Sequence, residues 1–250
     1  MLPHRETMTI RVVIPARNEA EALPKVLSQM PSYVDQVIVA DNGSTDGTAD
    51  VASAHGAITV RVEEPGYGRA CQAGVAAAGD CDILVFMDGD AADDPDDMDA
   101  LIAPIVEGQA DLVIGSRATG ERENGSLTPQ QIFGNALACR LMGMIWGGQF
   151  TDLGPFRAVR RDRYDILKMS APTFGWTVEM QIRALRRGLR CAEVPVRYRK
   201  RIGVSKISGT VRGVILAGYY ILGTIAVEGA HTMLQHLQNI GQQTRLKENI

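Results

Sequence analysis

Residues 83–90, Ile-Leu-Val-Phe-Met-Asp-Gly-Asp, form the stretch from which the fold and the chemistry of the chain can be predicted. The apolar run 83–87 is typical of a parallel strand that is covered on both faces. It leads into Asp88 and Asp90, and ligands bind at the carboxyl ends of strands in open α/β sheets. Two carboxylates at that edge suit a hard cation, so we expect them to hold Mg²⁺ or Mn²⁺ against a diphosphate. The alternative is a plain acidic turn, because further aspartates crowd residues 80–99.

Further apolar runs alternate with helical patterns along the first half of the chain. The other candidate strands in this half are 12–14, 37–39, 58–62 and 112–114. This alternation predicts an α/β fold with a mostly parallel sheet flanked by helices. A chain of 250 residues with 45% hydrophobic content can bury one such core. We expect the core domain at residues 1–208 and an amphipathic helical extension at 209–250.

Composition argues against several classes of protein. The net charge of -3 argues against a general nucleic-acid binder. The 4 cysteines form no CxxC pair and no zinc-site spacing with histidine, so we expect reduced thiols. The start of the chain lacks a signal-peptide pattern, which favours the cytoplasm. The uncharged stretch 213–227 is shorter than the ~20 residues that crossing a bilayer requires.

The ends of two other predicted strands and one glycine motif carry groups that can bind a nucleotide. The segment Pro-Ala-Arg-Asn-Glu at 15–19 ends the first strand, and Asp41 ends the second. A carboxylate such as Asp41 can accept from ribose hydroxyls or base N–H groups, although a plain Asx-type turn fits it equally well. Arg69 lies in Gly-Tyr-Gly-Arg-Ala at 66–70, before an alanine-rich helix whose free N–H groups can bind phosphate. This motif lacks the full GxGxxG and P-loop patterns, which argues against a dinucleotide enzyme and a P-loop NTPase.

Taken together, these motifs resemble the family-two glycosyltransferases with a GT-A fold, and among them the dolichyl-phosphate and polyprenyl-phosphate sugar transferases. The resemblance covers residues 8–212, and the order of the motifs makes it specific. The segments that carry it are VVIPARNE (12–19), VADNGSTDGT (39–48), GYGRACQAG (66–74), FMDGDAADDP (86–95), LVIGSR (112–117), TDLGPFRAVRR (151–161) and RYRKRIGVSKISG (197–209).

The resemblance implies a role for each motif. It implies that Asp88 and Asp90 hold the metal ion on the diphosphate of a UDP- or GDP-hexose, and that Arg117 contacts phosphate from the far side. Asp152 and Arg157 would face the transfer site, where a single displacement inverts the anomeric carbon. From the residues alone, Asp152 fits a loop cap and Arg157 a surface position equally well. The nucleotide pocket that the resemblance implies is formed by Pro15, Ala16, Glu19, Asp41, Arg69 and Asp88.

The chemistry of the acceptor decides whether a general base is needed. A phosphate monoester has a second pKa near ~6, so it is already an anionic nucleophile at neutral pH and mainly needs positioning and charge cover. A hydroxyl acceptor would need a general base, for which Asp152 and then Glu179 are the candidates. The residues that can cover an acceptor phosphate are Arg197, Arg199, Lys200, Arg201 and Lys206.

An apolar stretch, 211–227, follows this basic segment. Positive charge beside an apolar helix favours an anionic lipid surface, while packing on the protein's own core or on another subunit of a homo-oligomer is the alternative. We therefore predict a metal-dependent, inverting glycosyltransferase that moves a hexose from a nucleotide sugar to a polyprenyl phosphate at the cytoplasmic face of the membrane. The alternatives are transfer to a hydroxyl of a glycan, diacylglycerol or small alcohol, a non-catalytic sugar-nucleotide-binding subunit, and a nucleotidyltransferase.

Overall fold

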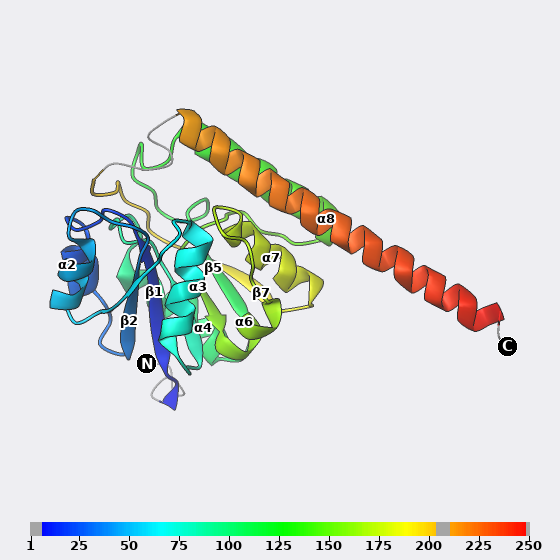
Figure 1. Ribbon diagram of the computed structural model, residues 1–250, viewed down its shortest axis with the longest axis horizontal. Coiled ribbons are helices and arrows are strands. Elements are labelled where there is room, and N and C mark those ends of the chain that lie inside the picture. Colours follow the sequence, from blue (N-terminus) through cyan, green and yellow to red (C-terminus); the bar gives the residue numbers. More distant parts are fainter. Residues whose placement is uncertain (1–6, 204–210, 249–250) are drawn as a thin grey trace.

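The structure is a computed structural model, and it describes residues 7–203 and 211–248. The strands within these ranges are β1 (Ile10–Ala16), β2 (Gln36–Asp41), β3 (Ile58–Arg61), β4 (Ile83–Phe86), β5 (Leu112–Ser116), β6 (Arg157–Arg160) and β7 (Cys191–Pro195). They form one sheet in the order β3-β2-β1-β4-β6-β5-β7 (Figure 1). Only β6 runs antiparallel to its neighbours, which confirms the mostly parallel sheet predicted from the sequence.

Helices connect the strands and cover both faces of the sheet. They are α1 (Leu23–Ser28), α2 (Thr48–Ala54), α3 (Tyr67–Ala78), α4 (Met98–Val106), α5 (Pro129–Trp146), α6 (Arg161–Leu167), α7 (Trp176–Arg186) and α8 (Val211–Glu248), with a short 3₁₀ helix at Pro95–Asp97. The first turn of α5 is closed by a capping box, in which Thr128 and Gln131 each accept from the backbone N–H of the other. The helix therefore begins at Pro129, with Thr128 as its N-cap.

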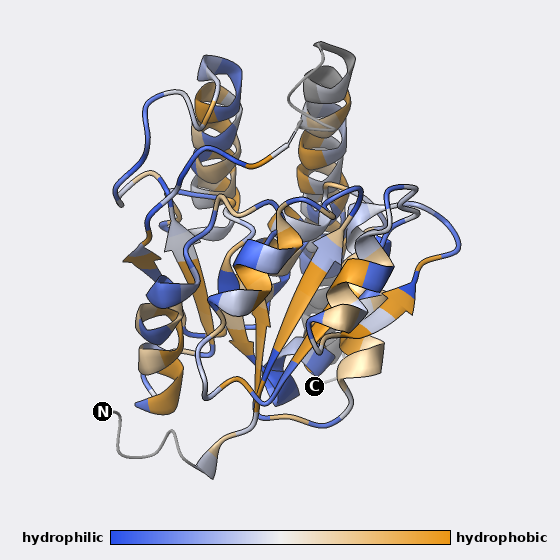
Figure 2. Cartoon of the chain, turned by 90° about the vertical axis from the view of Figure 1, so that its left-hand side faces the viewer, coloured by the Kyte–Doolittle hydropathy of each residue, from blue (hydrophilic) through white to orange (hydrophobic). Residues whose placement is uncertain are grey.

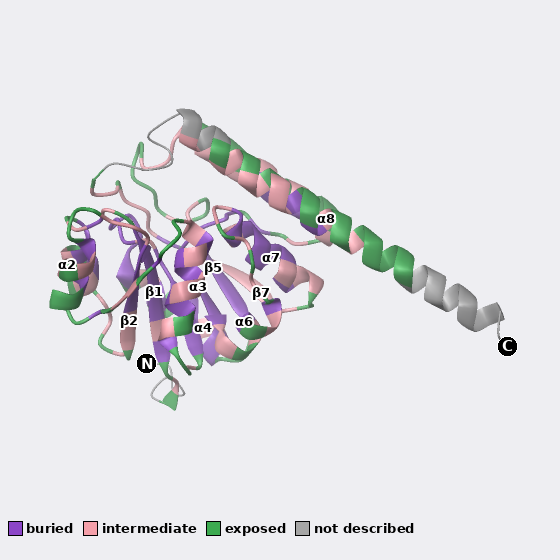
Figure 3. Cartoon of the chain, viewed as in Figure 1, coloured by how far each residue is buried: buried purple, intermediate pink, exposed green. Residues whose placement is uncertain are grey.

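The core consists of two apolar layers, one on each face of the sheet. Along β1, Val12 and Ile14 contribute to the layer that contains α1 and α4, because successive side chains of a strand point to opposite faces. Val13 belongs to the other layer, with Phe86 of β4 and Trp176 of α7. The strands β1, β4 and β5 are apolar and almost entirely buried between these layers, whereas the edge strands β3 and β7 are partly exposed (Figures 2 and 3). This explains why the strands appear in the sequence as continuous apolar runs.

The register of the central strands brings three polar segments to one edge of the sheet. Ala16 at the end of β1 pairs with Asp41 at the end of β2. Val13 of β1 pairs with Phe86, the last residue of β4, so the Asp88–Asp90 loop starts at the same edge. The fold therefore places the predicted nucleotide and metal residues on the side where open α/β sheets bind ligands.

The C-terminal helix α8 packs along α5 and α7, and its far end projects beyond the body of the protein (Figure 1). Ile225 is buried in the apolar layer of α7, and Glu228 pairs with Arg183 at 2.8 Å. The Trp146 indole N–H of α5 donates to Thr232 at 3.0 Å. In the described ranges, no helix combines the length and hydropathy needed to span a bilayer. The predicted domain boundary at 208/209 falls outside the described residues.

Candidate active site

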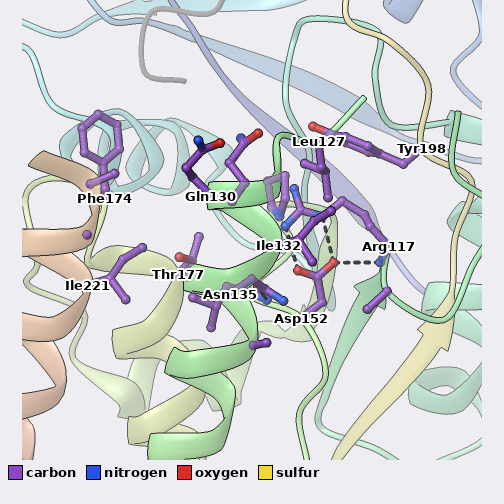
Figure 4. Close-up of a pocket in the computed structure, with 18 of the residues that line it drawn as sticks. Arg117, Leu127, Gln130, Ile132, Asn135, Asp152, Phe174, Thr177, Tyr198 and Ile221 are labelled. Carbon is purple, nitrogen blue, oxygen red and sulfur yellow. Dashed lines mark hydrogen bonds and ion pairs between the residues drawn. The ribbon is translucent and has the colours of Figure 1, made fainter. Parts of the chain in front are cut away.

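A cavity of about 410 Å³ opens at the carboxyl edge of the sheet. One end is polar and is lined by Asp88, Asp90 and Arg117. The other end lies between α5 and α8, where Phe174 and Ile221 are set well apart from Arg117 (Figure 4). The cavity therefore has the shape and polarity to hold a molecule with a charged head and an apolar body.

The loop that follows β4 holds two carboxylates at the polar end, as predicted. Asp90 is 3% exposed, and Asp88 accepts a hydrogen bond from the Tyr67 hydroxyl at 3.3 Å. Burial, and then the negative charge of Asp90, raise the pKa of Asp88 to about 7. Ala91 has a φ of 62°, a left-handed conformation that side-chain-bearing residues rarely adopt. The loop thus combines backbone strain at Ala91 with charge repulsion between Asp88 and Asp90, and a divalent cation held by these carboxylates would reduce the repulsion.

Asp93 is a third buried carboxylate beside this pair. One of its oxygens accepts from the backbone N–H of Asp88 at 3.3 Å, and the other has no hydrogen-bond partner among the described residues. Burial, and then the charges of Asp88 and Asp90, raise the pKa of Asp93 well above its ordinary value. Over the described part of the chain, no three His, Cys, Asp or Glu side chains converge as metal ligands. Two carboxylates nevertheless fit Mg²⁺ or Mn²⁺, because such ions commonly take their remaining ligands from water and substrate phosphates.

Among the basic side chains of residues 197–203, Arg201 is the one that lines the cavity. Its Nη2 lies 3.2 Å from Asp90 Oδ2 and 3.0 Å from Glu19 Oε1. Arg201 is thus placed at the boundary between the metal site and the cavity. Lys206, which was predicted to act with it, lies outside the described residues.

The other predicted phosphate-binding side chains of this segment do not line the cavity. Arg197 Nη2 pairs with Asp97 Oδ1 at 2.8 Å, and Arg199 pairs with the buried Asp94. Lys200 is exposed and is also absent from the cavity wall. In this structure the aspartates of the loop before α4 neutralise these arginines, so their charge is not directed at an acceptor.

Arg117 and Asp152 form a two-point ion pair at the polar end of the cavity. Asp152 Oδ2 accepts from the backbone N–H of Arg117 at 2.7 Å and from its Nε at 2.8 Å, while Oδ1 accepts from Nη2 at 2.7 Å (Figure 4). Burial lowers the pKa of Arg117, but the charge of Asp152 and its hydrogen bonds, together with the charges of Tyr198 and Asp93, outweigh burial and raise that pKa well above the ordinary value. The guanidinium also lies over the Tyr198 ring, 5.0 Å from its centroid. Arg117 is therefore a fixed cation, and Asp152 holds it in place.

The backbone around Asp152 is tied to two other elements. Glu193 of β7 accepts from the backbone N–H groups of Thr151 at 2.9 Å and of Asp152 at 3.1 Å. Asn135 of α5 donates to the Thr151 carbonyl at 2.9 Å. These supporting residues were not predicted from the sequence. They fix the loop that carries Asp152, and through it the orientation of the ion pair.

Arg157 does not line the cavity, in contrast to the expectation from the resemblance. Its side chain is fully buried, and its guanidinium donates to the carbonyl oxygens of Leu153, Gly154 and Thr177. The same group lies over the Trp176 ring, 5.8 Å from the centroid. Burial lowers the pKa of Arg157 to about 10. With its donors committed to backbone carbonyls, Arg157 holds the turn before β6 against the start of α7.

Glu179 also lies away from the cavity, although it was predicted as a second candidate base. It is buried on α7, where it accepts from the backbone N–H groups of Ser170 at 3.1 Å and Ala171 at 2.9 Å. Its Oε1 also pairs with Arg183 at 2.8 Å. Its carboxylate oxygens are therefore used to hold the loop before α7, and they do not face a substrate hydroxyl.

Apart from Asp88, which lines the cavity, the predicted nucleotide residues lie around the ends of β1 and β2 and the start of α3. Asp41 is 6% exposed and accepts from the backbone N–H of Ser44 at 2.9 Å, so the turn considered from the sequence does form. Ala16 lies opposite Asp41 in the sheet register, and Glu19 is buried beside the loop that follows β1. Arg69 stands at the start of α3 with its side chain partly exposed. The structure thus brings these residues to one edge, next to the cavity and not inside it.

Two tyrosines that line the cavity were missed by the sequence analysis. Tyr67 packs edge-on against Trp176 with ring centroids 6.2 Å apart, and burial raises its pKa well above the ordinary value. Tyr198 makes the ring contact with Arg117. Each had a signal in the sequence, since Tyr67 is the one aromatic residue of the glycine motif and Tyr198 interrupts the basic run.

Comparison with known proteins identifies the family of the sequence. Residues 11–167 match the family model described as "Glycosyl transferase family 2". An uncharacterized glycosyltransferase of Mycobacterium tuberculosis is 36% identical over 209 residues, which cover 83% of this chain and 94% of that protein. An undecaprenyl-phosphate mannosyltransferase of Micrococcus luteus is 33% identical over 224 residues, covering 82% of this chain and 90% of that protein. A polyprenol monophosphomannose synthase of Mycolicibacterium smegmatis is 29% identical over 224 residues, with coverage of 82% and 83%.

Solved structures show the same fold. Glucosyl-3-phosphoglycerate synthase from Mycobacterium tuberculosis, crystallised with Mn²⁺, uridine diphosphate and glucosyl-3-phosphoglycerate, superposes with a TM-score of 0.74 at 24% sequence identity. The match covers 92% of this chain and 84% of that one. At this level of identity the likeness establishes a shared GT-A architecture.

Proposed function

This chain belongs to glycosyl transferase family 2 and is a glycosyltransferase, and from that premise we propose that it transfers a hexose from a nucleoside-diphosphate sugar to a polyprenyl phosphate. We propose that the transfer is a single displacement with inversion at the anomeric carbon. The polar end of the cavity would then receive the reacting groups, and the apolar end the first part of the lipid chain.

The donor side of the proposal depends on Asp88 and Asp90. The residues fit Mg²⁺ or Mn²⁺, and a bound ion would neutralise the charge that develops on the departing nucleoside diphosphate. A solved relative of the same fold binds Mn²⁺ with uridine diphosphate, which supports a divalent ion here. Asp41 and the neighbouring residues at the ends of β1 and β2 would hold the nucleoside. Arg117 would contact the phosphates and stabilise the same developing charge.

The proposed acceptor follows from the surroundings of the two candidate bases, Asp152 and Glu179. Asp152 receives three hydrogen bonds from Arg117, and Glu179 is buried away from the cavity. A hydroxyl acceptor needs a base to take its proton, whereas a phosphate monoester with a second pKa near ~6 is already ionised at neutral pH. An acceptor that needs no base therefore fits this site better, and Arg117 and Arg201 can cover its charge.

The apolar end of the cavity supports a lipid as the body of the acceptor. Side chains of α5 and α8 form this end, and two of the relatives reported above are named for transfer to polyprenyl lipids. Phe133 of α5 and Tyr219 of α8 are each 70% exposed, and both helices adjoin the cavity. Exposed aromatic residues of this kind favour a membrane interface. We therefore propose a peripheral location at the cytoplasmic face, with α8 as part of the contact.

A comparison of acceptors tests this proposal. The protein is incubated with Mn²⁺, UDP- or GDP-hexoses, and either undecaprenyl phosphate or the matching alcohol, undecaprenol. We expect product only with the phosphate, and we expect that product to release its sugar in mild acid because a glycosyl phosphate is acid-labile. An acid-stable product formed on undecaprenol, a glycan or a small alcohol would contradict the proposed acceptor. Release of pyrophosphate from a nucleoside triphosphate would contradict the reaction class.

A further inference from the structure

Arg201 is fixed in position above the proposed metal site by its own backbone. The N–H of Ile202 donates to the Asp90 carbonyl at 2.9 Å, and the N–H of Arg199 donates to the Ala92 carbonyl at 2.8 Å. These two bonds lay the segment 199–202 along the loop that follows β4. The placement of the Arg201 guanidinium against Asp90 is thus a property of the fold, and not a chance contact of a long surface side chain.

Both oxygens of the Asp90 carboxylate have partners in this arrangement. Oδ1 accepts from the backbone N–H of Ala92 at 3.0 Å, and Oδ2 lies 3.2 Å from the Arg201 guanidinium. Asp90 is 3% exposed, so solvent screens this contact weakly. A divalent ion held by the Asp90 carboxylate would lie close to a fixed positive charge, and like charges at short distances repel strongly in a partly buried site.

We propose that Arg201 is a built-in competitor of the metal ion, an inference that rests on the proposed metal site at Asp88 and Asp90. The guanidinium and the ion would both bind the Asp90 carboxylate, so a metal ion alone would bind the free protein weakly. A nucleoside diphosphate changes this balance because its phosphates give Arg201 another anionic partner. Metal ion and diphosphate therefore bind cooperatively, each favouring the other by the same factor.

The geometry also gives the released arginine a second use. Arg201 is 30% exposed at its side chain and already lines the cavity next to Arg117. Once it leaves Asp90, its guanidinium can turn to a phosphate in the cavity without moving the backbone. From a position between the donor diphosphate and the acceptor phosphate, Arg201 could contact both, so its contribution to binding the acceptor would become available only after the metal–diphosphate pair has bound.

Titration with Mn²⁺ alone tests the competition, with free Mn²⁺ measured by electron paramagnetic resonance. We expect Arg201→Gln to tighten Mn²⁺ binding by about ten-fold, or about 1.4 kcal/mol. Arg199→Gln is the matched control, because it removes the same charge from the same segment and Asp94 keeps Arg197 as a partner at 2.9 Å. Its Mn²⁺ affinity should stay within about two-fold of the wild type. Equal effects of the two substitutions, or weaker binding by Arg201→Gln, would overturn the inference.

A second titration, in the presence of UDP and then of GDP, tests the cooperativity. In the wild type the nucleotide that binds should raise the affinity for Mn²⁺, and this enhancement should shrink about ten-fold in Arg201→Gln. An undiminished enhancement in the variant would also overturn the inference. Asp90→Ala separates the two proposals, because unchanged Mn²⁺ binding by that variant would reject the metal site itself. Thermal unfolding of each variant confirms that it is folded, and Arg201→Met replaces Arg201→Gln if the latter is not.

Discussion

The substitution Asp152→Asn removes the charge that holds Arg117 while leaving the shape of the side chain almost unchanged. The carboxylate accepts three hydrogen bonds from Arg117, two of them from the guanidinium. An amide has one acceptor oxygen, so it can keep only one of the two guanidinium contacts and turns its own NH₂ group toward the other donor. Arg117 should then lose its fixed orientation in the cavity.

The expected cost follows from the contact that is lost. A hydrogen bond to a charged group contributes about 1.5–3 kcal/mol, which corresponds to a reduction of kcat/KM by about 10- to 150-fold. Arg117→Ala should have an effect of similar size or larger, because it removes the cation itself. If Asp152 acts only through Arg117, the double variant should be no worse than Arg117→Ala alone.

The assay is transfer of a radiolabelled hexose to undecaprenyl phosphate, measured across a range of pH for the wild type and the three variants. Thermal unfolding is measured in parallel, so that loss of activity is not confused with loss of the fold. A positioning role predicts that Asp152→Asn lowers the rate and leaves the shape of the pH profile unchanged. Multiplicative effects of the two substitutions, or loss of the acidic limb of the profile, would show that Asp152 acts as a base and would refute the reasoning.

Three further predictions concern stability and membrane binding. The hydrogen bond from Arg190 lowers the pKa of Asp111 to about 2. The Asp111 carboxylate therefore stabilises the fold at pH values above the unfolded-state pKa near 4, and this stabilisation is lost as the pH falls toward 2. Asp111→Asn should therefore lower the free energy of unfolding in urea by about 1–2 kcal/mol at pH 7 and by almost nothing near pH 2. A difference between the variant and the wild type that stays constant across pH would contradict this prediction. Arg157→Met should destabilise the protein by about 3–5 kcal/mol because three buried carbonyl oxygens lose their donor, and a loss below 1 kcal/mol would show that they find other partners. The double substitution Phe133→Ser and Tyr219→Ser should reduce the fraction of protein that co-sediments with anionic vesicles and leave the free energy of unfolding unchanged. Unaltered vesicle binding would place the membrane contact elsewhere.

The central part of the sheet could be predicted because strands β1, β4 and β5 are buried on both faces. Runs such as 83–87 and 112–114 are continuous and apolar, and the polar residues that follow them mark the edge of the sheet. Asp88 and Asp90 could be placed at that edge for the same reason, since position in a parallel sheet determines where a strand end lies. The antiparallel insertion of β6 beside β4 could not be predicted, because strand order depends on contacts between segments that are distant in the sequence.

The direction of individual side chains could not be predicted from the sequence. Arg157 and Glu179 lie in motifs near the site, yet both point into the protein and bind backbone groups. A motif gives the position of a residue along the chain and does not say whether its side chain turns to the cavity or to the core. For the same reason the sequence does not distinguish Arg201, which contacts Asp90, from Arg197, which pairs with Asp97.

Anomalous diffraction from a crystal grown with Mn²⁺ and the bound nucleoside diphosphate tests the central claim most directly. The account predicts a manganese peak within coordinating distance of Asp90, bridged to the two phosphates, with Arg201 turned away from that carboxylate. A manganese peak remote from the loop after β4, or a diphosphate bound away from this edge of the sheet, would contradict it.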